Sequence, residues 1–376
     1  MKLPAALVGL ALAGSVSAEQ FLLYVGTYTG AKSEGIYAYR FDSRSGEVTE
    51  LGLAAKSINP TFLAVHPNGR FVYACNETDK WRDQPGGYVT AFKVEPATGQ
   101  LTELNQQSSV GGGPCHLNVD GSGQNVLVAN YGGGSVASLP LSSDGSLKPH
   151  SAFVQHVGSS VNPARQKEPH GHSVNLSPDN RFAFVADLGT DKVHAYAFDA
   201  VAGSLTARSE LDVVMTPGSG PRHFAFGPKG ARAYVINELL QTVTSFRYAP
   251  KTGKLTAVDT VSTLPDAQPV PGNSTAEVRV HPNGKFVYGS NRGHDSIAVF
   301  AVGKGGKLSA IQHMPVGGKT PRNFNFDPSG RFLVAGHQGS DSFAVFTVDG
   351  KSGKLTATGK TYKVGAPVCF RFVPLR

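Results

Sequence analysis

Apolar and polar residues alternate in a pattern that returns about seven times along the chain. Its clearest copy covers 220–238, where an alternating strand begins with Arg222, a Pro-Lys-Gly turn follows, and a second, apolar strand ends at Asn237. A period of two on both sides of a turn signal predicts an antiparallel β-hairpin. Because a hairpin brings the start of its first strand to the end of its second strand, we expect Arg222 to lie close to Asn237 and Glu238.

The repeats divide the chain into units that are expected to form a closed ring. The front of the chain lacks the leading strand of the pattern, and its predicted strands cover 21–28, 35–42 and 45–51. Six full four-stranded units follow, which begin at Asn59, Gly113, Gly171, Gly220, Ser274 and Thr320. A lone first-strand pattern over 366–374 ends the chain, and it can complete the first sheet and cover its edge. Repeats of about 46 to 55 residues therefore predict an all-β, seven-bladed β-propeller with four-stranded blades, closed by its C-terminal strand, whereas tandem β-sandwiches would leave that strand unexplained.

The composition fits a large β-sheet protein that binds a small anion. The 376 residues are 40% hydrophobic and 16% charged, and 45 glycines and 24 prolines suit many tight turns. The formal net charge of +8 is spread without blocks of Lys and Arg, which argues against a nucleic-acid partner and favours attraction of small anions. Three cysteines, Cys75, Cys115 and Cys369, allow one disulfide at most, leave its pairing open and show no metal-ligand spacing.

The first 18 residues are predicted to be a signal peptide. They combine a short basic start, an apolar run too short to cross a bilayer, and a Val-Ser-Ala ending at Ala18. A buried first strand is the alternative, but 21–25 already supplies a strand. No other segment approaches the run of about 18 apolar residues that a membrane span needs. We therefore expect a single propeller domain over 19–376, periplasmic or secreted, with no membrane span.

The inner strands of a propeller line its central channel, so corresponding positions of the repeat should form rings at one rim. The position of Arg222 is occupied in the other units by Thr61, Cys115, His172, Ala276, Arg322 and Val368. The position of Asn237 is occupied by Thr27, Asn76, Asn130, Asp187, Asn291 and His337. The position of Glu238 is occupied by Tyr28, Glu77, Tyr131, Leu188, Arg292 and Gln338. We expect three further polar residues near the same rim, namely His116, His223 and Arg279.

Four of these residues are the candidate catalytic group, namely His172, Arg222, Glu238 and Arg279. Three basic side chains and one acid from three successive blades are hard to explain as packing. Arginines bind carboxylate or phosphate groups through paired N–H donors, and a Glu and a His can move protons near neutral pH. The chain contains neither a Gly-x-Ser-x-Gly elbow nor a His-Glu-x-x-His metal motif, so we expect acid/base chemistry on a small anion without cofactor or metal.

Six further residues are candidates for substrate binding, namely His116, Asn130, Asp187, His223, Asn237 and Arg322. Each type has a structural alternative. Asn and Asp at strand ends often make turns by bonding to their own backbone. His116 and His223 could be core histidines with satisfied ring nitrogens.

Five motifs stand out along the repeats, namely His172-Ser-Val-Asn-Leu-Ser-Pro-Asp, Gly220-Pro-Arg-His, Asn237-Glu-Leu, Arg279-Val-His-Pro-Asn-Gly-Lys-Phe-Val-Tyr and Pro321-Arg-Asn-Phe-Asn-Phe-Asp. Together they resemble those of the seven-bladed β-propeller lactonases, a family that includes propeller-type 6-phosphogluconolactonases and carboxy-cis,cis-muconate lactonising enzymes. The resemblance covers residues 21–376 and implies a propeller fold and action on a lactone. It also implies that His172, Arg222, Glu238 and Arg279 form the active site.

The leading hypothesis is hydrolysis of a sugar-derived lactone. Either Glu238 or His172 takes a proton from the attacking water, while Arg222 and Arg279 hold the anionic group of a lactone or sugar acid, or stabilise the oxyanion. Lactonisation of a muconate by the same residues is one alternative. A non-catalytic exported propeller that binds a glycan or a protein is the other. Because 6-phosphogluconolactone is a cytoplasmic intermediate and export is predicted, phosphorylation of the substrate stays open.

Overall fold

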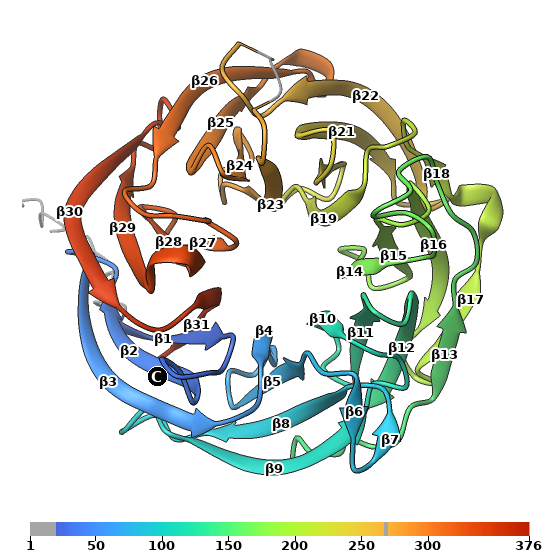
Figure 1. The fold of residues 1–376 in the computed structure, drawn as a ribbon, viewed down its shortest axis with the longest axis horizontal. Coiled ribbons are helices and arrows are strands. Elements are labelled where there is room, and N and C mark those ends of the chain that lie inside the picture. The colour runs from blue at the N-terminus through green and yellow to red at the C-terminus, as the bar shows by residue number, and fades with distance from the viewer. Residues whose placement is uncertain (1–19, 267–269, 376) are drawn as a thin grey trace, which may run out of the picture.

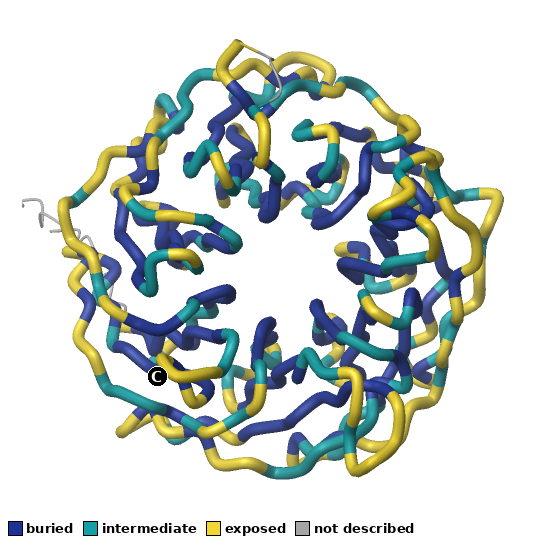
Figure 2. Tube along the Cα trace, viewed as in Figure 1, coloured by how far each residue is buried: buried dark blue, intermediate teal, exposed yellow. Residues whose placement is uncertain are grey.

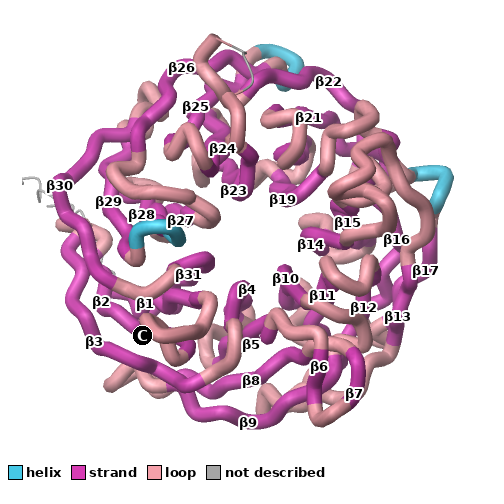
Figure 3. Tube along the Cα trace, in the orientation of Figure 1, coloured by secondary structure: helices cyan, strands magenta, loops and turns pink. Residues whose placement is uncertain are grey.

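Seven antiparallel sheets surround a central channel in the computed structural model, which describes residues 20–266 and 270–375 (Figure 1). Strands and connecting loops make up nearly all of this part of the chain (Figure 3). The short helical turns are η1 (Ser209–Leu211), η2 (Lys304–Gly306) and η3 (Gln338–Ser340). The predicted all-β, seven-bladed propeller is therefore confirmed. The predicted signal peptide over 1–18 lies outside the described residues.

The first four blades follow one another along the chain. The first contains β1 (Gln20–Thr27), β2 (Gly35–Asp42), β3 (Glu47–Lys56) and β31 (Pro367–Pro374). The second contains β4 (Pro60–Val65), β5 (Phe71–Asn76), β8 (Tyr88–Val94) and β9 (Leu101–Ser108), and the hairpin β6 (Lys80–Trp81) and β7 (Gln84–Pro85) lies between β5 and β8 in the sequence. The third contains β10 (Pro114–Val119), β11 (Asn125–Asn130), β12 (Ser135–Pro140) and β13 (Ala152–Gln155). The fourth contains β14 (Gly171–Leu176), β15 (Phe182–Asp187), β16 (Lys192–Asp199) and β17 (Ser204–Ala207), with β18 (Val213–Val214) paired to β16.

The last three blades repeat the same four-stranded order. The fifth contains β19 (Pro221–Phe226), β20 (Arg232–Asn237), β21 (Thr242–Ala249) and β22 (Lys254–Ser262). The sixth contains β23 (Ser274–Val280), β24 (Phe286–Arg292), β25 (Ser296–Val302) and β26 (Leu308–Pro315). The seventh contains β27 (Phe324–Phe326), β28 (Phe332–His337), β29 (Ser342–Val348) and β30 (Leu355–Lys363).

The core lies between neighbouring blades. Residues of the inner strands are mostly buried, whereas the outermost strand of each blade consists mainly of partly buried and exposed residues (Figure 2). At the contact of the fourth and fifth blades, the ring of Phe184 stacks on Phe224 at 5.7 Å and meets the edge of Tyr248 at 5.9 Å. Strands with a period of two can face a neighbouring blade on both sides, and this explains the long apolar runs of the middle strands.

The C-terminal strand β31 closes the ring, as predicted. It pairs antiparallel with β1, and the register sets Val25 opposite Phe370 and Phe21 opposite Pro374. The ring of Phe370 also meets Phe343 of the seventh blade at 5.5 Å. One strand therefore supplies both the missing edge of the first blade and part of its packing against the last.

Removing residues 366–376 is expected to abolish cooperative folding. The truncation takes away the buried side chains of Val368, Phe370 and Val373 and exposes one edge of β1. Burial of each such side chain contributes about 1.5 to 3 kcal/mol, and a whole domain is stable by about 5 to 15 kcal/mol. Thermal unfolding followed by circular dichroism tests this. A chain that ends at Pro374 is the control and should melt cooperatively, and a wild-type melting temperature for the shorter chain would contradict the closure.

Bulges at the start of the inner strands arrange side chains in layers along the channel. In β19 the register moves from Pro221 opposite Asn237 to His223 opposite Ile236, so Arg222 has no partner. Five other inner strands have a shift at the corresponding place, namely β4, β10, β14, β23 and β31. A bulge re-aims the side chains beside it. Arg222 and the next residue, His223, consequently both line the channel, although consecutive residues of a regular strand point to opposite faces.

The three cysteines are buried and none forms a disulfide. Cys75 and Cys369 lie in the apolar core between the first and second blades, and Cys115 lies at the bulge of β10. Within the described ranges, no helix is long and apolar enough to cross a membrane.

Candidate active site

Glu238 lies directly after β20 at one mouth of the channel and binds three arginines. Its Oε2 atom lies 2.9 Å from Nε of Arg222 and 3.0 Å from Nη2 of Arg292. Its Oε1 atom lies 2.8 Å from Nη2 of Arg165. The carboxylate and Arg222 are almost fully buried, with side-chain exposures of 5% and 1%. The hairpin therefore brings Arg222 and Glu238 together as its pattern predicts.

The charges of this group control one another. Burial would raise the pKa of the Glu238 carboxyl, but Arg292, Arg222, His172 and Arg165 outweigh burial and lower it far below the usual range. Burial lowers the pKa of Arg292 to about 9 and Arg222 adds to this effect, while Glu238 opposes it. At neutral pH Glu238 is consequently ionised and Arg292 is protonated.

A second carboxylate lies at the same mouth. Glu77 accepts hydrogen bonds from the Tyr28 hydroxyl at 2.8 Å and from Oγ1 of Thr61 at 2.6 Å. The guanidinium of Arg322 lies over the Tyr28 ring, 5.5 Å from its centroid. Within the described part of the chain, the Arg322 side chain has neither a hydrogen bond nor an ion pair with a carboxylate within 4 Å. It is therefore a cation with unused donors.

We call the side chains of Arg165, Arg222, Arg292, Arg322, Glu77, Glu238 and His172 the upper site. Its four arginines and two glutamates leave a formal excess of two positive charges. An excess of this kind in a largely buried group attracts an anion.

His172 is buried beside Cys115. Its Nδ1 atom lies 3.5 Å from the sulfur of Cys115, and its ring meets the edge of Tyr131 at 5.2 Å. Burial, followed by the positive charge of Arg222 and then by His223, lowers the pKa of His172 well below its ordinary value of 6.5. The imidazole is therefore neutral at physiological pH.

Three aromatic side chains in mutual contact, Phe62, His116 and His223, close the channel below this layer, and we call them the plug. The ring centroids of Phe62 and His116 are 4.1 Å apart, and those of His116 and His223 are 5.3 Å apart. Burial lowers the pKa of both histidines well below 6.5, so the plug is neutral. A cavity of about 10 Å³ lies between the plug and the upper site, lined by Arg222 and Cys115 among others.

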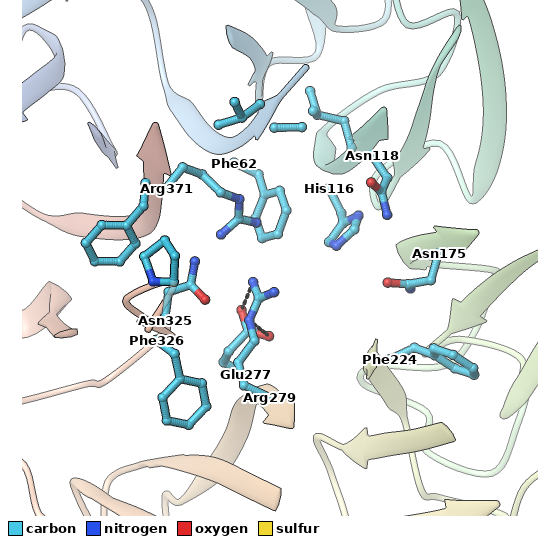
Figure 4. Close-up of a pocket in the computed structure, with 15 residues that line it drawn as sticks. Phe62, His116, Asn118, Asn175, Phe224, Glu277, Arg279, Asn325, Phe326 and Arg371 are labelled. Atoms are coloured by element: carbon cyan, nitrogen blue, oxygen red, sulfur yellow. Dashed lines mark hydrogen bonds and ion pairs between the residues drawn. The ribbon is translucent and has the colours of Figure 1, made fainter. Parts of the chain in front are cut away.

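The structure does not bring Arg279 to the upper site, and its predicted position at that rim is wrong. Arg279 lies three residues beyond Ala276, and a strand advances by about 3.3 Å per residue. Its side chain points into a cavity on the far side of the plug, where Nε lies 3.4 Å from Oε1 of Glu277 (Figure 4). His116 lines the same far cavity.

Comparison with known proteins agrees with this architecture. Residues 22–372 match the family described as lactonase, seven-bladed β-propeller. This chain belongs to the seven-bladed β-propeller lactonase family.

Three relatives of the lactonase are similar to it over almost their whole lengths. A Bacillus subtilis protein named 6-phosphogluconolactonase is 37% identical over 94% of this chain and 99% of its own. The structure of the periplasmic gluconolactonase of Pseudomonas aeruginosa has a TM-score of 0.86 and 34% identity, and the match covers 95% of this chain and 100% of that one. A Bacteroides fragilis crystal structure has a TM-score of 0.88 at 35% identity, covering 96% and 99%.

The predicted family is thus confirmed, and so is the prediction of an enzyme in the lactone-hydrolase class. Nothing in these comparisons favours a muconate-lactonising enzyme or a non-catalytic propeller.

The strand-end residues predicted to bind substrate are used inside the blades of the lactonase. The amide of Asn130 donates to the Ser109 carbonyl and to Ser135, both at 3.0 Å. The amide of Asn237 donates to Thr242 and Thr244. In the same register, Oδ1 of Asp187 accepts backbone N–H groups of His170, Gly189 and Thr190. Their side chains stabilise turns and hold strands together within and between blades. The residues that follow Asn130 and Asn237, namely Tyr131 and Glu238, are the ones that reach the upper site.

Asp187 also belongs to a group with metal-ligand chemistry outside the channel. Ligand atoms of His156, Asp187 and His194 all lie within 4.8 Å of one another. Nδ1 of His156 bonds to Asp187 at 2.5 Å, and its Nε2 bonds to the Tyr196 hydroxyl at 2.9 Å. His194 bonds to Asp212 at 3.0 Å through Nδ1. Because these ring nitrogens already have partners, the contacts fit a hydrogen-bonded network, and a metal would have to displace them.

Two arginines of the upper site were missing from the candidate residues. Arg292 occupies the same position of the repeat as Glu238, so its register was a usable signal. Arg165 belongs to the long insertion 158–169, whose position in space the repeat pattern does not predict. Its guanidinium also donates to the Tyr131 hydroxyl at 3.1 Å, and the neighbouring Gln166 anchors the insertion by donating to the Leu188 carbonyl at 2.9 Å.

Proposed function

We propose that this lactonase hydrolyses a sugar-derived lactone that carries an anionic group, and that the reaction takes place at the upper site. The observation that supports this most directly is the excess positive charge around an ionised Glu238 and a neutral His172. A proton acceptor and several fixed cations suit an ester carbonyl that gains negative charge when water attacks it.

His172 is the general base in this proposal. Glu238 is a poor proton acceptor because three arginines bind both of its carboxylate oxygens and hold its pKa far below neutrality. A neutral imidazole has a free lone pair at physiological pH. Burial raises the pKa of the Cys115 thiol, which therefore keeps its proton and can donate it to the His172 carbonyl oxygen at 3.4 Å. Its sulfur is then left to accept the Nδ1 proton of His172, so Nε2 is the atom that takes a proton from water.

The arginines divide into two tasks. Arg222 bonds to Glu238 through Nε and to the Ala276 carbonyl through Nη1, and these bonds fix the plane of its guanidinium. Its remaining Nη2 donor can stabilise the tetrahedral oxyanion. Glu238 is a positioning residue that orients Arg222 and Arg292. Arg322 has no carboxylate within 4 Å among the described residues and binds the anionic group of the substrate.

The predicted location of the enzyme bears on the identity of its substrate. The signal-peptide pattern over 1–18 favours export, and one relative is a periplasmic gluconolactonase. Another relative is named 6-phosphogluconolactonase. We therefore propose a periplasmic enzyme and test both substrates, δ-gluconolactone and 6-phospho-δ-gluconolactone. Ring opening is followed by proton release, with buffer alone as the reference for spontaneous hydrolysis. Turnover of neither lactone would contradict the proposed function.

Replacing Arg322 with alanine is expected to raise KM for the phosphorylated lactone by about 10-fold or more, because one charge-assisted contact is worth about 1.5 to 3 kcal/mol. The effect on unphosphorylated lactone should be much smaller. Arg181→Ala is the matched control, since this arginine is 54% exposed and pairs with Asp179 in a surface turn. Equal KM values for the Arg322 variant and the wild type on both lactones would remove Arg322 from the site.

A further inference from the structure

A second cavity opens at the other mouth of the channel, beyond the plug. It measures about 340 Å³, which lies within the range of small-molecule sites, about 300 to 1,000 Å³. Five polar residues line it, each on an inner strand and two positions beyond the level of the plug in the repeat, namely Asn118, Asn175, Arg279, Asn325 and Arg371. We propose that this cavity, the lower site, is a second binding site, specific for a small hydroxylated monocarboxylate.

Arg371 supplies a positive charge that favours the binding of an anion. Its Nη1 atom donates to the Phe370 carbonyl at 2.7 Å, and its guanidinium lies 4.5 Å from the centroid of the Phe62 ring. Within the described residues it has no carboxylate within 4 Å. The remaining N–H donors of Arg371 are held near the plug in a fixed orientation, and Figure 4 shows the guanidinium at the edge of the cavity.

Glu277, the acidic residue in the lining of this cavity, already has several hydrogen-bond and ion-pair partners. Its carboxylate lies 3.1 Å from Nδ1 of His223, contacts Arg279 through two atoms at 3.4 Å, and accepts the amide of Asn323. His223 is neutral. Two arginines and one glutamate therefore leave one formal positive charge in the lower site. One carboxylate neutralises it, whereas a phosphate dianion would leave an excess of negative charge in a partly buried place.

The rest of the lining suits hydroxyl groups and C–H bonds. Asn118 and Asn175 lie across the cavity from Arg371, and Asn325 lies beside it (Figure 4). Within the described chain, the amide of Asn118 has no hydrogen-bond partner, so both its donor and its acceptor are available. Amides of this kind bind hydroxyl groups, and the rings of Phe224 and Phe326 supply apolar walls.

The lower site is independent of the proposed reaction. The plug separates it from Glu238 and His172, and none of its lining residues belongs to the upper site. Loss of binding at the lower site should therefore leave lactone turnover intact.

Calorimetric titration with sodium gluconate tests the proposal. Arg371→Met is expected to weaken one gluconate site by about 10-fold or more, since a charge-assisted hydrogen bond is lost, while kcat/KM for the lactone stays unchanged. Arg371→Lys keeps the charge and should retain most of the affinity. Asn118→Leu, which fills the opposite wall, should weaken the same site even if Arg371→Met folds poorly. Sorbitol, an uncharged polyol, and inorganic phosphate should bind at least about 10-fold more weakly than gluconate. Unchanged gluconate affinity in both Arg371→Met and Asn118→Leu would overturn the lower site, as would binding that disappears only when Arg222 is replaced.

Discussion

Replacing Arg222 with methionine is expected to lower kcat/KM for the lactone by about 100- to 1000-fold, the usual cost of removing one oxyanion donor. The guanidinium is buried, is fixed by Glu238 and the Ala276 carbonyl, and keeps one donor for the substrate. Water cannot replace a donor that the blades hold in position. Rates on both gluconolactones measure the effect. Arg371→Met is the matched control because it removes another channel arginine on the far side of the plug.

Arg222→Met should also destabilise the protein, and this effect can be separated from catalysis. Removing one partner of a buried ion pair costs about 3 to 5 kcal/mol. The double variant Arg222→Met with Glu238→Gln removes both charges, so it should recover part of the melting temperature but none of the activity. If the double variant recovered turnover together with stability, Arg222 would act only through folding.

The blades could be predicted because each repeat carries its own local signals. Apolar alternation and Asn-Gly or Ser-Gly turns locate hairpins, and the orphan strand over 366–374 indicated how the ring closes. The contact between Arg222 and Glu238 followed from the hairpin alone. Short-range rules therefore recovered both the fold and the centre of the candidate site.

The depth of each side chain in the channel was harder to predict. Arg279 and the rim residue Ala276 share one strand. The sequence pattern does not show the bulge in this strand, so it did not reveal that Ala276 lies at the rim while Arg279 reaches the lower cavity. Asn130 and Asn237 were assigned to the channel because they end inner hairpins, yet their amides bond within their blades. A shift of one residue along the chain decides whether a side chain enters the channel or bonds within its own blade.

Long-range partners lay beyond sequence reasoning for a different reason. Arg165 belongs to an insertion whose path is set by tertiary contacts such as that of Gln166 with Leu188. Arg292 does share the register of Glu238, but nothing in one sequence indicates that it bonds to that carboxylate across a blade boundary. The upper site consequently contains more arginines than the predicted group of four catalytic residues.

Replacing His172 with glutamine is expected to lower kcat by about 100- to 10,000-fold, the range for loss of a general base. In the wild type, burial and Arg222 hold the pKa of His172 well below 6.5, so the base stays neutral as the pH falls through that value. The wild-type plot of kcat/KM against pH should therefore stay level through pH 6.5 and fall only at lower pH. The small residual rate of the glutamine variant should lose this acid limb.

Acid unfolding must be distinguished from titration of the base. His116, His172 and His223 are all buried with lowered pKa values, so the unfolded chain binds more protons below pH 6.5 and stability declines as the pH falls. Melting temperatures across the same pH range locate that loss. His281→Gln is the control, because His281 is buried at the opposite edge in a turn where it bonds to the Gly330 carbonyl, and its turnover should match the wild type. A His172→Gln enzyme with the full wild-type rate and the same acid limb would assign the proton transfer to another group.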